Sequence, residues 1–255
     1  MSDTASTSSD GASGDEAALA HLLHRARNYP YAAPEHSYLY AEDGIRAFDA
    51  AARDGRTPVL AIGSNRAPER LKQKFGHAAH HVIPVQRARL HHFDVVYSAH
   101  ITSYGAAPAM LQASPGTAAE IWVTWLDDEQ LAIMHETERG AANYHYAELP
   151  GVKLQMEDGR VERSAYAYVS TRGHYLHQGK PLALADVPAT GRRFAAARTG
   201  DALEHVRARV GASALDPDSF VVKLVQDAAY RRGVTERIAE DAVPLQHPYR
   251  IIEEG

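Results

Sequence analysis

Runs of apolar residues alternate with turn residues through the middle of the chain, a pattern typical of short strands. The predicted strands cover 57–62, 82–85, 89–99, 109–112, 120–126, 144–149, 152–156 and 161–169. Asp158 and Gly159 separate the last two runs and predict a hairpin. Ser114, Pro115 and Gly116 predict a turn between the runs at 109–112 and 120–126.

Other segments space their apolar residues as helices do. Helical spacing or helix boundary signals predict helices at 15–29, 44–53, 67–75, 127–139, 189–210 and 219–232. Many strands with two interposed helices predict an α+β fold, namely a small mixed β-barrel with flanking helices and a helical C-terminal extension.

The same pattern divides the chain into four parts. Residues 1–14 are polar and small, which predicts a disordered tail. Residues 15–56 form a helical N-terminal arm, residues 57–170 the barrel domain, and residues 171–255 a mostly helical C-terminal extension.

Composition excludes several classes of function. The 255 residues carry a formal net charge of -5, which argues against a nucleic-acid partner. No apolar stretch is long enough to span a membrane, so we expect a cytoplasmic protein with no membrane partner. Cysteine is absent, which removes disulfides, thiolate metal sites and a cysteine nucleophile.

Tyrosines crowd the segment that follows the first predicted helix. Tyr29, Tyr31, Tyr38 and Tyr40 could line a binding pocket. Packing is the simpler interpretation, in which the rings hold the N-terminal arm on the core with their hydroxyls at the rim.

Two features are candidates for chemistry. Gly63, Ser64 and Asn65 lie between a strand and a helix, where unpaired N–H groups can hold a carboxylate or an oxyanion. The alternative is a plain helix cap. Glu138 lies near the end of the helix predicted at 127–139, and it could act as a base or be a solvated carboxylate.

Three motifs in order give the chain a family resemblance. They are VLAIGSNRAPERL at 59–71, EIWVTWLDDEQLAIMHETERGAANYHYAEL at 120–149 and LQMEDGRVERSAYAYV at 154–169. Together they resemble the gamma-glutamylcyclotransferase-like family, over roughly residues 57–170.

This resemblance implies a site and a reaction. Ile62, Gly63, Ser64 and Asn65 match the loop that binds the substrate's gamma-glutamyl group, and Tyr144 matches a tyrosine that shapes the pocket. Glu138 matches the catalytic acid/base. The implied reaction is attack of the substrate's α-amine on its own side-chain carbonyl, giving 5-oxoproline and a free amine, with no cofactor and no metal.

Alternative functions remain open at this point. Ile62 stands where the family usually has tyrosine, which favours a non-catalytic binding or assembly module with the same fold. Transfer of the gamma-glutamyl group to another amine is a third possibility. The leaving amine and the oligomeric state are not predicted.

Histidines and arginines add two further alternatives. His77, His80 and His81, or His91 and His92, could hold a metal, although adjacent strand residues point to opposite faces and no HExxH-type spacing is present. The pairs Arg192-Arg193 and Arg231-Arg232 are expected on solvated faces, unless one arginine binds a substrate carboxylate.

Overall fold

The computed structural model describes residues 9–78, 81–139 and 143–254. Its strands are β1 Tyr38–Ala41, β2 Gly44–Ala47, β3 Thr57–Ala61, β4 Val82–Tyr97, β5 Ala109–Leu126, β6 Tyr144–Met156, β7 Val161–Ser170, β8 Leu176–His177, β9 Lys180–Leu184, β10 Ala189–Thr190, β11 Ala195–Ala197 and β12 Arg250–Glu253. Its helices are α1 Ser9–Arg27, α2 Pro68–Phe75, α3 Asp128–Arg139, α4 Thr199–Arg209, α5 Pro217–Gln226 and α6 Ala228–Ala239, with 3₁₀ turns η1 Ala50–Arg53 and η2 Ser64–Arg66.

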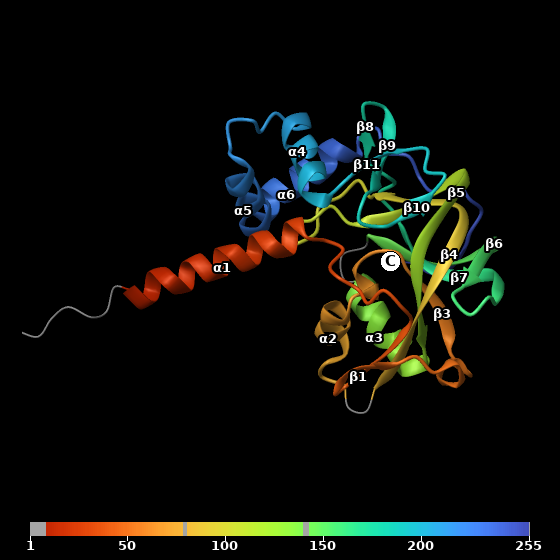
Figure 1. The fold of residues 1–255 in the computed structure, drawn as a ribbon. Helices are drawn as coiled ribbons and strands as arrows, with labels where there is room; N and C mark the ends of the chain where they lie inside the picture. The colour runs from red at the N-terminus through yellow and green to blue at the C-terminus, as the bar shows by residue number, and fades with distance from the viewer. Residues whose placement is uncertain (1–8, 79–80, 140–142, 255) are drawn as a thin grey trace, which may run out of the picture.

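The central sheet closes on itself. Strands β5, β3, β7, β6 and β4 are neighbours in that order, and β4 pairs again with β5. Within this ring β3 and β7 run parallel, whereas the other neighbours are antiparallel. The predicted α+β fold with a mixed β-barrel is therefore confirmed, and Figure 1 shows helices on its flanks.

Two of the barrel strands are longer than predicted. The runs at 82–85 and 89–99 form one strand, because the polar Gln86 between them is buried and accepts hydrogen bonds from Arg53 Nη1 at 2.9 Å and Trp125 Nε1 at 3.2 Å. The turn predicted at 114–116 was wrong. That segment is an irregular stretch inside β5, where the pairing with β4 shifts beside Phe93.

The N-terminal arm differs from its prediction. The helix predicted at 44–53 was wrong, because residues 44–47 pair with β1 as a hairpin, and Gly44, the first residue after its turn, has φ of 122°. Only Ala50–Arg53 forms a 3₁₀ turn, capped by Asp49. Helix α1 begins at Ser9, six residues before the expected start, and residues 1–8 of the predicted tail lie outside the described chain.

The C-terminal third contains more strand than predicted. Residues 189–197 are extended rather than helical, since Arg192 extends to Asp94, which is fully buried, and donates to both carboxylate oxygens at 3.0 Å. The arginine is therefore part of the core and not of a solvated face. The helix predicted at 219–232 is divided at Asp227, whose side chain accepts from Tyr230 N at 2.9 Å and caps α6.

Apolar residues form two buried clusters. One fills the barrel and continues under α4, α5 and α6, where Phe220 and Leu224 are fully buried. The other lies between the barrel and the pair α2 and α3, which Figure 1 shows side by side below the barrel. In the described part of the chain, no helix combines the length and apolarity that crossing a membrane requires.

Candidate functional site

Strand β3 carries the Gly-Ser-Asn turn to one end of the barrel. Its alternate residues Val59 and Ala61 pack toward α2 and α3, while Leu60 and Ile62 belong to the cluster inside the barrel. The chain leaves the barrel at Gly63, and η2 then leads into α2. Strand β3 therefore fixes where the turn begins.

Arg66 anchors the far end of this turn. Its carbonyl oxygen accepts a hydrogen bond from the Tyr38 hydroxyl at 2.7 Å, and its guanidinium carbon lies 4.7 Å from the centre of the Trp122 ring. The turn is thus held by the hairpin β1–β2 and by β5, both outside the turn's own sequence.

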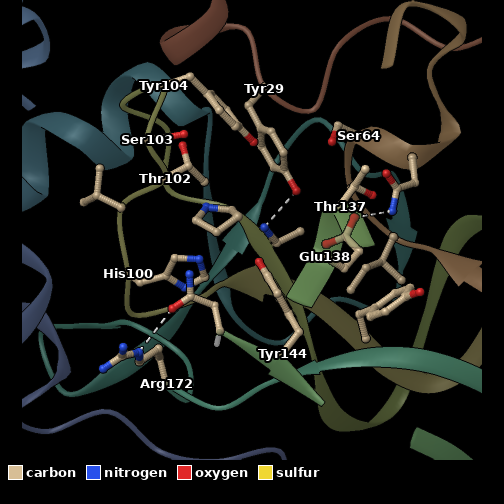
Figure 2. Close-up of a pocket in the computed structure, with 18 of the residues that line it drawn as sticks. Tyr29, Ser64, His100, Thr102, Ser103, Tyr104, Thr137, Glu138, Tyr144 and Arg172 are labelled. Carbon is tan, nitrogen blue, oxygen red and sulfur yellow. Dashed lines mark hydrogen bonds between the residues drawn. The ribbon is translucent and has the colours of Figure 1, made fainter. Parts of the chain in front are cut away.

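Helix α3 brings Glu138 to the same place. Asn65 Nδ2 donates a hydrogen bond of 3.0 Å to Glu138 Oε1, and Lys74 Nζ donates to the same oxygen. Met134 is fully buried one helical turn earlier and anchors α3 against the second cluster. The turn and Glu138 are separate candidates by local pattern, and the family resemblance implies that they share one site; in the structure they are in direct contact (Figure 2).

Lys74 is the main group that opposes the effect of burial on Glu138. Only 1% of the lysine side chain is exposed, and Nζ also lies 3.2 Å from Met134 Sδ. Burial alone would raise the pKa of Glu138, but the charge of Lys74 and the hydrogen bonds from Lys74 and Asn65 outweigh it and lower that pKa. Glu138 is consequently an ionised carboxylate at neutral pH.

Asn65 and Glu138 border a cavity of about 460 Å³. Tyr29, Tyr104 and Tyr144 line it, and burial raises the pKa of all three phenols, so that they remain protonated hydrogen-bond donors. Among the described residues, the Tyr144 hydroxyl has no hydrogen-bond partner, and Figure 2 shows the Tyr144 side chain pointing into the space that Tyr29, His100 and Glu138 surround. A bound molecule with oxygen acceptors would satisfy these donors.

His100 forms the wall opposite the turn. Burial, with the nearby charge of Arg172, lowers the pKa of His100 to about 3, so the imidazole is neutral. Its Nδ1 lies 2.9 Å from Ser98 Oγ, and its ring packs edge-on against Tyr144 with centroids 5.6 Å apart. His100 is thus a fixed, uncharged polar group of the cavity.

The cavity is bordered by an excess of positive charge. Arg70, Arg172, Arg231 and Arg232 line it, against the carboxylates of Glu138 and Glu236. Because Lys74 neutralises Glu138, the surroundings favour an anionic ligand although the whole chain is acidic. The Arg231-Arg232 pair, expected on a solvated face, borders this cavity.

The site contains residues that the sequence did not identify. Lys74 was missed, although its position three residues after Leu71 places it on the buried stripe of α2. For Tyr29 packing was the preferred interpretation and pocket lining the alternative; the residue is buried, and it also lines the cavity. His100 follows the end of β4 and no local pattern singled it out.

The metal alternative gains no support from the described residues. Within them, no three side chains of the types that ligate metals gather closely enough to hold an ion. His77 is exposed and His81 stacks on Tyr40 with ring centroids 5.3 Å apart. His80 lies outside the described residues.

Gly63 offers a direct test of the turn's close packing. An added Cβ would overlap the Tyr29 hydroxyl and approach Ala109 Cβ to 3.4 Å. We expect Gly63→Ala to displace Tyr29, to destabilise the fold by about 1–3 kcal/mol in urea unfolding, and to remove ligand binding. Gly200→Ala is the matched control, since its Cβ would meet nothing within 4 Å. If the two variants have the same unfolding free energy and bind ligand equally well, this close packing at Gly63 is contradicted.

Comparisons with known proteins report a likeness of fold. No family model and no curated protein matches the chain. A solved structure described as gamma-glutamyl cyclotransferase matches with 17% identity and a TM-score of 0.36, over 76% of this chain and 92% of the other. An uncharacterized protein from Homo sapiens matches with 15% identity and a TM-score of 0.36, over 85% and 94%. At these TM-scores the likeness carries no argument about function, which must be argued from this chain's own site.

Proposed function

We propose that this protein is a gamma-glutamylcyclotransferase-like enzyme, which releases 5-oxoproline and a free amine from a gamma-glutamyl compound. The observation that carries the proposal is the contact between Asn65 and Glu138 at the border of the cavity. It joins the proposed acyl-binding turn to a carboxylate at one cavity, and these are the two groups that an intramolecular acyl transfer needs.

The roles of the residues follow from their chemistry. Gly63, Ser64 and Asn65 bind the gamma-glutamyl group, with Ile62 and Tyr144 as walls of the cavity. Glu138 takes a proton from the substrate's α-ammonium group, and the freed amine attacks the γ-carbonyl carbon. The new C–N bond closes the lactam, and the bond to the leaving nitrogen breaks. Overall the α-nitrogen loses two protons and the leaving nitrogen gains two. Glu138 transfers these protons one at a time.

A panel of gamma-glutamyl compounds tests this proposal. We expect 5-oxoproline as product, and higher kcat/KM for gamma-glutamyl amino acids than for gamma-glutamyl alkylamines, because the arginines at the cavity favour an additional carboxylate. The measurement is quantification of 5-oxoproline by mass spectrometry. Absence of this product from every compound would contradict the proposed reaction.

A non-catalytic binding module is the second candidate. The ion pair with Lys74 favours it, because a carboxylate with a lowered pKa is a weaker base. Such a module would bind gamma-glutamyl compounds in calorimetry and leave them intact. Transfer of the acyl group to an added amine would instead give a new gamma-glutamyl amide, which the same product analysis detects.

A further inference from the structure

Tyr29 enters the site from outside the barrel. It follows α1 by two residues, and its side chain is 5% exposed. Its hydroxyl oxygen accepts a 3.0 Å hydrogen bond from Ala109 N and lies where a Cβ on Gly63 would be. The phenol oxygen is therefore in contact with the backbone of the turn, and Figure 2 shows its hydrogen bond as a dashed line.

The position of Tyr29 is fixed by other parts of the chain. Thr199 Oγ1, at the start of α4, donates to the Tyr29 carbonyl oxygen at 2.7 Å. The hydroxyl of Tyr97 in β4 lies 3.2 Å from the same Thr199 oxygen. The Tyr29 ring also packs edge-on against Tyr31, with centroids 6.1 Å apart. A donor held in this way needs little rearrangement when a ligand binds.

The proton of the Tyr29 hydroxyl is available to a ligand. The oxygen already accepts from Ala109, and within the described residues no group accepts the phenolic proton. Burial, with the charge of Glu138, raises the pKa of Tyr29 to about 12, although the backbone N–H groups of Ala109 and Ser64 act against it. The phenol therefore keeps its proton throughout the neutral range.

We propose that Tyr29 is a catalytic hydrogen-bond donor to the acyl oxygen of the substrate bound at the Gly63 turn. This inference rests on the proposed function. When the α-amine attacks the γ-carbonyl carbon, the C=O π electrons move to oxygen, and the developing oxyanion accepts the Tyr29 hydrogen bond. When the bond to the leaving nitrogen breaks, the carbonyl re-forms and the proton stays on Tyr29 throughout. The N-terminal arm thus supplies part of the catalytic site.

Tyr29→Phe is the first test, because it keeps the ring and removes the donor. We expect kcat to fall by about 10²-fold while KM changes less, as for loss of one oxyanion donor. Tyr31→Phe is the matched control, since the Tyr31 hydroxyl donates instead to Arg25 O at 3.1 Å. That variant should keep wild-type kcat.

A second variant separates donation from structure, because Tyr29→Phe also leaves Ala109 N without its acceptor. Replacing Tyr29 with 3-fluorotyrosine keeps the oxygen and gives a more acidic phenol. We expect wild-type-like activity at neutral pH and a fall in kcat at a lower alkaline pH than in the wild type, because only the protonated phenol donates. If Tyr29 has only a structural role, the pH at which kcat falls on the alkaline side should be the same as in the wild type.

The outcomes distinguish this inference from the proposed function. If wild-type protein forms 5-oxoproline and Tyr29→Phe matches it, the assignment of Tyr29 is overturned and the proposed function stands. If the alkaline fall of kcat occurs at the same pH in the 3-fluorotyrosine protein as in the wild type, the assignment is overturned as well. If wild-type protein forms no 5-oxoproline, the proposed function fails and the assignment fails with it.

Discussion

Glu138→Gln is expected to lower kcat/KM for 5-oxoproline formation by about 10²–10⁴-fold, the usual contribution of a general acid/base. Glutamine keeps the size of the side chain and an oxygen that can accept from Asn65 and Lys74. It cannot carry a proton from the α-nitrogen to the leaving nitrogen. Substrate binding should therefore change less than turnover, which steady-state kinetics with a gamma-glutamyl amino acid will measure.

Glu136→Gln provides the matched control for this experiment. Glu136 lies two residues earlier on α3, and its side chain is exposed. Both variants remove one negative charge from the same helix, so only loss of the reacting carboxylate should separate them. Retention of more than a tenth of wild-type activity by Glu138→Gln would contradict the role of Glu138.

The local sequence was enough to predict the strand, the turn and the helix that carry the site residues. The apolar run of β3 followed by Gly63 is a short-range signal, and so is the amphipathic helix that carries Glu138. The mixed barrel followed from the same reasoning, because repeated short strands need to close or stack. The contact between Asn65 and Glu138 could not be derived from periodicity, since it depends on how α2 and α3 pack on the barrel.

The errors arose where a tertiary partner overrides the local signal. Gln86 continues a strand because Arg53 and Trp125 satisfy its side chain, and Arg192 enters the core because Asp94 lies there. The same holds for Lys74, which is buried only because Glu138 neutralises it. A polar residue within a strong apolar pattern therefore signals a distant partner, although the sequence does not say which one.

Lys74→Met tests the buried ion pair directly. Methionine is close to lysine in length and suits the apolar side of this position, where Nζ lies beside Met134 Sδ. It leaves Glu138 without its counter-ion, and breaking a buried pair costs about 3–5 kcal/mol. We expect a loss of this order in the free energy of unfolding at pH 7.5, measured with urea. The double variant Lys74→Met with Glu138→Gln should recover most of it.

The pH dependence of that loss has a defined sign. In the wild type the pKa of Glu138 is lowered, so the stabilisation from ionised Glu138 is present above the ordinary carboxyl value of 4.5 and is lost as pH falls through the lowered pKa. Without Lys74, burial is opposed only by the Asn65 hydrogen bond and the charge of Arg70, so we expect the pKa of Glu138 to rise. The deficit of Lys74→Met should therefore shrink as pH falls from 7.5 toward 4.5, and the acidic limb of kcat/KM should move to higher pH. In the double variant both effects should disappear, because no carboxylate titrates at position 138. A deficit of Lys74→Met that is constant over this range would show that Lys74 stabilises the fold through something other than Glu138.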